Sequence, residues 1–239
     1  MTRAMLSVDW DYFIPESNIQ DWSHRESLLY LTTIWPTRCD WIDKTTTTGE
    51  HLTFWHDVRK RFPEMAQRIT RTVEVSDSHA WIWPTLSSVQ PDAIVLVDAH
   101  HDCWCPKEDR REQVGCDTWG WQYLNLYPRV KIYWMRAKWS HFPAPDEVSE
   151  DRVCIIESLD ELPNDMEIWD VHACRSGCWT PPWHDAEFLE FVRASDLRID
   201  TVQNGEWDPM SDRWTDEMQE TCQQFAAQYE ALREGRLKL

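Results

Sequence analysis

Three side chains that can bind metal ions follow one hydrophobic run of the chain. The run is Ile94–Val97, and Asp98, His100 and Asp102 come directly after it. Such a run is typical of a strand buried on both faces of a parallel sheet, and ligands bind beyond the carboxyl ends of such strands. On an extended chain, the spacing of two places these side chains on one side. Carboxylate oxygen and imidazole nitrogen suit Mn, Fe or Zn; the alternative is a polar, solvated loop after a strand.

Side chains that can bind metal ions also follow two other expected strands. Asp9 and Asp11 follow the apolar run Ala4–Val8, and His79 follows Thr72–Val75. Four acids and two histidines are enough for two cations that share bridging carboxylates. Two such cations lower the pKa of a water between them. Four acids gathered without a cation would repel one another strongly, so the cluster predicts bound metal.

Strands and helices that could position these residues alternate along the chain. Strands are expected at residues 4–8, 72–75, 94–97, 129–135, 152–156 and 167–172. Helices are expected at 21–34, 51–62, 63–70, 185–195 and 212–233, the last with Ser211 as its N-cap. An irregular loop or lid is expected at 103–120. This alternation predicts one α/β domain over residues 1–239, a three-layer sandwich with a mostly parallel sheet.

Charge and composition restrict the partners of the chain. Its 239 residues carry 24 basic and 42 acidic side chains, a net charge of −18. That charge argues against nucleic acid and against an anionic membrane surface as partners. It would attract a cationic substrate or peptide, although acidity alone also maintains solubility. With no secretory signal and no apolar run long enough to span a membrane, we expect a cytoplasmic protein whose eight cysteines are reduced.

Three motifs resemble those of the arginase or ureohydrolase superfamily. Asp98–Asp102 (D-A-H-H-D) matches the D-A-H-x-D motif of that family, and Ser7–Asp11 (S-V-D-W-D) is similar to its S-x-D-x-D motif. Ser76–His79 (S-D-S-H) resembles its G-G-D-H motif with the glycines lost. In the family D-A-H-x-D precedes S-x-D-x-D, whereas here the order of these two motifs is reversed. The resemblance therefore implies an arginase-like sheet with an altered strand order.

The resemblance also implies a set of ligands and a reaction. It implies two Mn²⁺ ions, bridged by Asp98 and Asp9, with His79 and Asp102 completing one and His100 and Asp11 the other. Water activated between the ions would attack a guanidinium carbon and release urea and an amine. More narrowly, the short tryptophan-rich chain resembles the peptide arginases, which convert arginine side chains of ribosomally made precursor peptides (RiPP biosynthesis) into ornithine. The acidic charge and the 17 tryptophans fit such a substrate.

Further residues are candidates for the chemistry around this centre. His101 is a candidate proton shuttle beside the ligands, and Glu157, Asp170 and His172 are candidates for the substrate pocket. Asp170 and His172 are also rivals of Asp9 and Asp11 for the second metal, because their segment follows D-A-H-H-D in the order usual for the family.

Two other functions remain open from the residues alone. One is a ureohydrolase or a deacetylase-like metal hydrolase that acts on a small cationic molecule. The other is a metal-stabilised binder of basic peptides that catalyses no reaction.

Overall fold

Strands alternate with helices in this computed structural model. The described residues are 1–15, 35, 38, 45–67, 72–108, 111, 113–146, 148–202, 208–234 and 236. The strands are β1 (Thr2–Asp9), β2 (Thr72–Ser76), β3 (Ala93–Asp98), β4 (Lys131–Arg136), β5 (Val153–Ile156), β6 (Met166–Cys174) and β7 (Arg198–Thr201). The α-helices are α2 (His51–Arg61), α3 (Ile82–Val89), α4 (Trp119–Leu126), α5 (Asp185–Arg193) and α6 (Asp216–Arg233). The described residues also form the short 3-10 helices η1 (Trp10–Phe13), η3 (Pro63–Gln67) and η4 (His79–Trp81).

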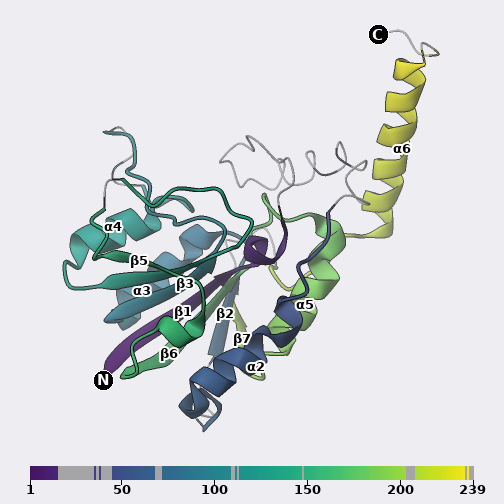
Figure 1. Cartoon of the computed structure of the whole chain (residues 1–239). Coiled ribbons are helices and arrows are strands. Elements are labelled where there is room, and N and C mark those ends of the chain that lie inside the picture. The colour runs from purple at the N-terminus through teal and green to yellow at the C-terminus, as the bar shows by residue number, and fades with distance from the viewer. Residues whose placement is uncertain are drawn as a thin grey trace.

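The seven strands form one sheet in the order β5-β4-β3-β1-β6-β2-β7 (Figure 1). Every pair of neighbouring strands in it is parallel. The carboxyl ends of all these strands therefore point to the same edge of the sheet, where ligands bind in α/β folds. The α/β class with a parallel sheet is confirmed, while the arginase-like character of the sheet stays a prediction.

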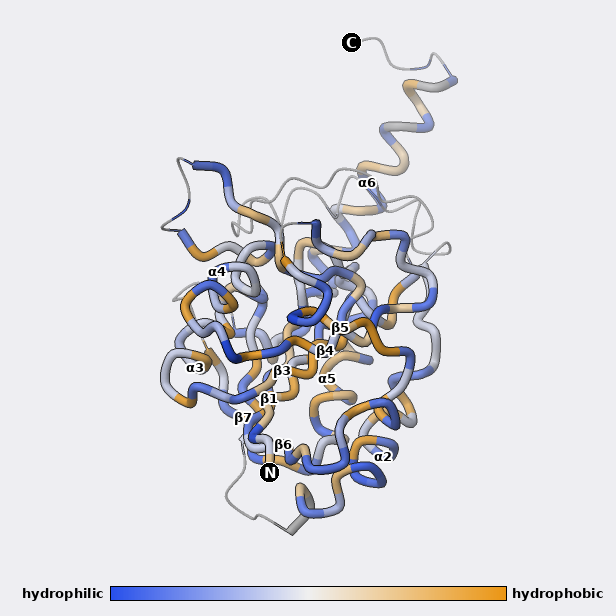
Figure 2. The backbone as a smooth tube through the Cα atoms, turned by 60° about the vertical axis from the view of Figure 1, so that its left-hand side comes forward, coloured by the Kyte–Doolittle hydropathy of each residue, from blue (hydrophilic) through white to orange (hydrophobic). Residues whose placement is uncertain are grey.

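Helices cover both faces of the sheet, so the molecule has three layers. On β3, Val95 and Val97 belong to the core that contains side chains of α2 and α5, whereas Ile94 and Leu96 belong to the core with α3 and α4. Figure 1 shows the two helix pairs on opposite sides of the sheet. Figure 2, coloured by residue hydropathy, shows hydrophobic residues concentrated in the central strands. The run is apolar throughout because both faces of β3 are buried.

Several elements differ from the expectation. Helix α4 forms within the segment expected to be irregular, and the short strand β7 was not expected. In place of a helix over 63–70, η3 extends over Pro63–Gln67. The expected helix at 21–34 lies outside the described residues.

The last helix begins later than expected because a different residue caps it. The Thr215 hydroxyl accepts the amide of Met218 at 3.2 Å, which is the N-cap geometry. Ser211 instead donates from its hydroxyl to the Asp208 carbonyl at 2.7 Å. The prediction of Ser211 as the N-cap is wrong, and α6 extends away from the sheet (Figure 1).

Two findings bear on the expected location. None of the described helices combines the length and the apolar character that crossing a membrane requires. Cys222 is disulfide-bonded, which departs from the expectation of reduced thiols. Cys103, Cys105 and Cys154 are free cysteines.

The central position of β3 gives a stability prediction. We expect Leu96→Ala to lower the free energy of unfolding by about 2–5 kcal/mol, because it removes a fully buried side chain and leaves a cavity. Leu52 on α2 is 78% exposed, so the same substitution there should change that free energy by less than about 0.5 kcal/mol. Urea unfolding followed by circular dichroism measures both variants. Equal losses at the two positions would contradict the placement of β3 in the core.

Candidate metal centre

The carboxyl ends of β1 and β3 lie side by side and carry the first acids of the site. Val8 pairs with Val97 in the sheet, so Asp9 and Asp98, the next residues, are neighbours. Asp11 follows in η1, and its amide donates to Asp9 Oδ1 at 3.1 Å. The three carboxylates are at most 3% exposed. They are buried because both strands lie in the middle of the sheet.

The ring of His79 faces three of the carboxylates. This histidine begins η4, just after β2, and is 1% exposed. Its Nδ1 atom lies 3.2 Å from Asp9 Oδ2 and 3.0 Å from Asp98 Oδ2. The same atom lies 2.8 Å from Asp102 Oδ2. These are the three acids that the resemblance groups with His79.

A second histidine faces the other side of the cluster. His100 Nδ1 lies 2.9 Å from Asp11 Oδ2 and 3.6 Å from Asp98 Oδ1. Asp98 therefore contributes one oxygen toward each ring. Two groups of ligand atoms result, one from Asp9, His79 and Asp98 and one from Asp11, Asp98 and His100, and within each group the atoms lie within 4.8 Å of one another.

The polar atoms of the cluster leave lone pairs without hydrogen-bond partners. Asp11 Oδ2, Asp98 Oδ2 and His79 Nδ1 are buried and make no hydrogen bond. The short contacts of His79 Nδ1 thus lack hydrogen-bond geometry, although atoms of opposite type are near. Buried polar atoms are almost always satisfied, and cations bound at the two groups of ligand atoms would satisfy them. These buried groups could hold a metal ion.

Burial and repulsion disturb the ionisation of the cluster. Burial, followed by the charges of Asp9 and Asp98, raises the pKa of Asp11 well above its usual value. Burial and Asp98 also raise the pKa of Asp9, and they bring that of Asp102 to about 7. Burial alone would lower the pKa of His79, but the carboxylates of Asp102, Asp9 and Asp98 together outweigh it and raise the pKa well above the ordinary value. The cluster therefore draws in positive charge, and metal binding would replace these protons.

Asp102 joins the cluster because the chain turns there. Its φ of 50° lies in the left-handed region, which residues other than glycine seldom adopt. The Gly120 amide donates to the Asp102 carbonyl at 2.8 Å, and a Cβ atom on Gly120 would meet that oxygen at 2.8 Å. The expectation of an extended chain through Asp102 was wrong, since a turn and this close approach place the third ligand.

Two residues that the sequence analysis missed hold the acids in position. Ser176 Oγ donates to Asp9 Oδ2 at 2.8 Å, from a backbone with a φ of 54°. Trp119 Nε1 donates to Asp102 Oδ2 at 2.8 Å. Such outer contacts orient metal ligands. No sequence signal pointed to either residue, because each contact spans elements distant in the chain.

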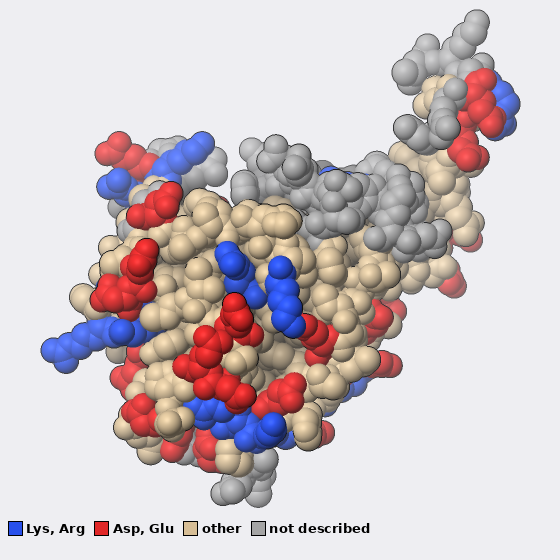
Figure 3. Space-filling model, viewed as in Figure 1, with Lys and Arg blue, Asp and Glu red and all other residues tan. Residues whose placement is uncertain are grey.

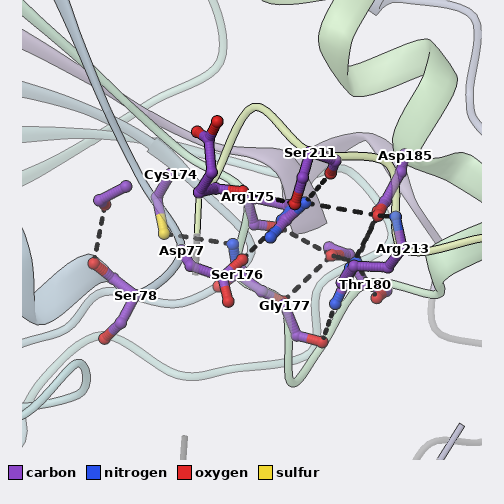
Figure 4. Close-up of polar contacts among 12 residues, drawn as sticks. Asp77, Ser78, Cys174, Arg175, Ser176, Gly177, Thr180, Asp185, Ser211 and Arg213 are labelled. Atoms are coloured by element: carbon purple, nitrogen blue, oxygen red, sulfur yellow. Dashed lines mark hydrogen bonds and ion pairs between the residues drawn. The ribbon is translucent and has the colours of Figure 1, made fainter. Parts of the chain in front are cut away.

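Buried arginines fix the segment that follows β6 (Figure 4). Arg213 Nη1 donates to the Gly177 carbonyl at 2.7 Å, and its Nη2 donates to the Thr180 carbonyl at 3.0 Å. Its guanidinium also pairs with Asp185, with Nη2 2.6 Å from Oδ1. Because both charges are about 1% exposed, the pair depends on good geometry to offset desolvation.

The second arginine attaches the same segment to the residue that follows β2. Arg175 Nε lies 2.5 Å from Asp77 Oδ1, and its Nη1 donates to the Ser211 carbonyl at 2.5 Å. A Cβ atom on Gly177 would meet Asp77 Oδ1 at 2.7 Å, so glycine allows the close approach. The segment is thereby fixed from two sides, and it carries Ser176 and Trp179 to the site.

A pocket of about 280 Å³ opens onto the cluster. Its described walls are Asp9, His79, His100, Asp102, Trp104, Cys116, Asp117, Phe142, Ser176 and Trp179. The ring of His100 lies between two aromatic walls, with centroid distances of 4.3 Å to Phe142 and 5.3 Å to Trp179. A larger pocket of about 440 Å³ involves none of the six candidate ligands among its described lining residues. The smaller pocket is the one that gives access to the cluster.

The candidate proton shuttle, His101, lies in the core and not in the pocket wall. It is 0% exposed, its Nδ1 accepts the Cys103 amide at 3.0 Å, and its ring packs on Trp104 at 4.4 Å. Burial lowers its pKa to about 4, so the ring is neutral near pH 7. This burial outside the described walls of the pocket argues against the shuttle role.

The three candidates for substrate binding also lie outside the described walls of this pocket. Glu157 follows β5 and lines the larger pocket. Asp170 lies within β6 opposite Met5, four residues before the strand ends. His172 is 0% exposed and contacts Ser7 in the sheet. The second acidic group is therefore Asp9 and Asp11, and not the rival pair on β6.

Comparisons with protein-family models, with curated proteins and with solved structures found no match to this chain. The interpretation of the site therefore rests on the geometry above.

The lone pairs without partners give a prediction about metal. We expect Mn²⁺ to raise the thermal unfolding midpoint and a chelator to reverse the effect, because a ligand present at about 100 times its Kd adds about 2.7 kcal/mol to the stability. Asp98→Asn should remove this response, since Asp98 contributes to both groups of ligands. Asp57→Asn, on the exposed side of α2, should keep it. Calorimetry measures all three proteins, and a full response in Asp98→Asn would show that the metal binds elsewhere.

Proposed function

We propose that this protein is an Mn²⁺-dependent hydrolase of the arginase type, acting on arginine side chains of a peptide. The product side chain is ornithine, and urea is released. The observation that carries the proposal is the convergence of six candidate ligand side chains, of which three have buried atoms without a hydrogen bond and four line one pocket. The motif resemblance supplies the reaction class.

The resemblance implies the roles of the residues in the proposed centre. Asp98 and Asp9 would bridge two cations, with His79 and Asp102 holding one and His100 and Asp11 the other. A pair of bound divalent cations supplies a water that is activated near neutral pH. Ser176 and Trp119 hold the carboxylates of Asp9 and Asp102 in fixed orientations. The pocket brings the substrate group to this floor.

The size and the walls of the pocket favour a side chain as the substrate. Its volume of about 280 Å³ lies near the lower end of the range of roughly 300–1,000 Å³ for small-molecule sites. Its described walls contain no lysine or arginine. Among these residues, therefore, no basic side chain is placed to bind the α-carboxylate of a free amino acid. An arginine within a peptide has no such carboxylate.

Residues of the pocket wall outside the ligand cluster would bind the guanidinium. Asp117 is the one acid among the described walls that is not one of the six candidate ligands, and its carboxylate suits a guanidinium. Trp104, Phe142 and Trp179 add aromatic surface, which attracts cations. The net charge of −18 favours approach of a basic peptide, and basic groups are interspersed with acidic ones on the face drawn in Figure 3.

We expect arginine-containing peptides incubated with the Mn²⁺-loaded protein to lose one cyanamide unit per modified arginine, with urea released in equal amount. Mass spectrometry and a urea assay measure the two products. Turnover of free arginine or agmatine in place of the peptides would favour the small-molecule hydrolase. Bound metal without any turnover would favour the binding protein.

Asp117 provides a variant that separates recognition from chemistry. We expect Asp117→Asn to lower kcat/KM for the peptide by roughly 10- to 100-fold, mainly through KM, because it removes one charge-assisted hydrogen bond. The matched control is Glu157→Gln, an acid that lines the larger pocket, and it should behave as the unmodified protein. An unchanged KM in Asp117→Asn would exclude this contact with the substrate.

A further inference from the structure

A continuous line of hydrogen bonds runs from the ring of His79 into the sheet. His79 Nε2 lies 2.7 Å from Ser7 Oγ, which lies 3.1 Å from His172 Nδ1. His172 Nε2 lies 2.9 Å from Ser76 Oγ, and this hydroxyl donates to the Ser78 carbonyl at 2.8 Å. We call His79, Ser7, His172 and Ser76 the relay. Each of its members is at most 1% exposed.

The relay occupies positions where the sheet otherwise carries apolar side chains. Ser7 and His172 are register partners on β1 and β6. Met5, two residues before Ser7, belongs to the core on the side of α3 and α4, so alternation directs Ser7 to the same side. Buried polar side chains at such positions destabilise a fold unless they bond one another, and here each one does.

The directions of these hydrogen bonds can be deduced from the end of the line. A carbonyl oxygen only accepts, so Ser76 gives its single hydroxyl proton to Ser78 and must accept from His172 Nε2–H. Neutral His172 then has a bare Nδ1, which accepts the Ser7 proton. Ser7 in turn accepts from His79 Nε2–H. Each donor in the relay meets an acceptor.

The opposite direction requires a charged His172. An imidazolium would donate from both nitrogens, to Ser7 and to Ser76, and would be a fully buried cation in contact with neutral hydroxyls. Such a charge is costly to bury.

We propose that His172 is a positioning residue for the metal centre: through Ser7 it holds His79 as the Nε2–H tautomer, so that the Nδ1 lone pair faces Asp9, Asp98 and Asp102. The inference rests on the metal centre of the proposed function, and it assigns to His172 a role other than contact with substrate. A metal-bound histidine commonly donates its other ring N–H, which fixes its orientation. Here the acceptor of the His79 Nε2–H is the Ser7 hydroxyl, and His172 orients that hydroxyl by accepting its proton.

The first test reads the tautomers directly. In the Zn²⁺-loaded protein, labelled with ¹⁵N at histidine, long-range ¹H–¹⁵N correlation spectra distinguish a protonated ring nitrogen from a bare one. We expect protons on Nε2 of both His79 and His172, with His172 Nδ1 bare. A proton on His172 Nδ1, or a bare Nε2 on His79, would overturn the proposal in the unmodified protein, whether or not any variant folds.

The second test measures affinity for Mn²⁺ alone by equilibrium dialysis. His172→Phe keeps the ring volume and removes both hydrogen bonds, so we expect affinity to fall by about 10- to 100-fold. His172→Asn retains an acceptor for Ser7 and should recover most of the loss. His51→Phe, a buried histidine on α2, controls for the general effect of replacing a core histidine. Unchanged affinity in folded His172→Phe, or no recovery in His172→Asn, would contradict the proposal.

These outcomes separate the relay from the reaction. A protein that binds Mn²⁺ with the expected tautomers but releases no urea would retain the relay and lose the proposed function. A protein that releases urea with the opposite tautomers would retain the function and lose the relay.

Discussion

Repulsion among buried carboxylates is the constraint on which this site depends. Asp9, Asp11, Asp98 and Asp102 are all at most 5% exposed. Two like charges 4 Å apart cost about 4 kcal/mol at an effective dielectric constant of 20, whereas a whole domain is stable by only about 5–15 kcal/mol. Four ionised acids therefore cannot share this volume unless positive charge enters it. Protons supply that charge in part, as the raised pKa of Asp11 shows, and divalent cations would supply it more fully.

The central strands bring the carboxylates together, and a few local features that cost conformational energy hold them there. Parallel β1 and β3 bring two acids together at one edge of the sheet. Asp102 and Ser176 adopt left-handed backbone conformations, each of which costs on the order of 1–3 kcal/mol and persists because neighbouring contacts fix it. Arg175 and Arg213 hold the segment of Ser176 from two sides. Strain and buried charge thus concentrate around one pocket, a distribution typical of a functional site.

The sequence predicted the parts of this arrangement that depend on local pattern and residue type. An all-apolar β3 predicted a strand buried on both faces, and few residue types other than Asp and His bind hard cations. The contacts of Ser176, Trp119 and Asp117 could not be predicted, because they depend on how distant segments pack. Helix α4 was missed because Gly120 and a preceding charged run favour a loop, and β7 because its four residues are only partly buried. Histidine is a common metal ligand, but His172 lies within the sheet, where it contacts Ser7 and Ser76 and does not line the pocket.

Anomalous diffraction from crystals of the Mn²⁺-loaded protein tests the central claim most directly, because it locates each metal without reference to activity. Two peaks are predicted within one buried site, one beside His79 Nδ1 and the other beside His100 Nδ1, with Asp98 contacting both. A single peak, or peaks only at exposed acids on the surface, would contradict the view that the buried carboxylates exist to hold a pair of cations.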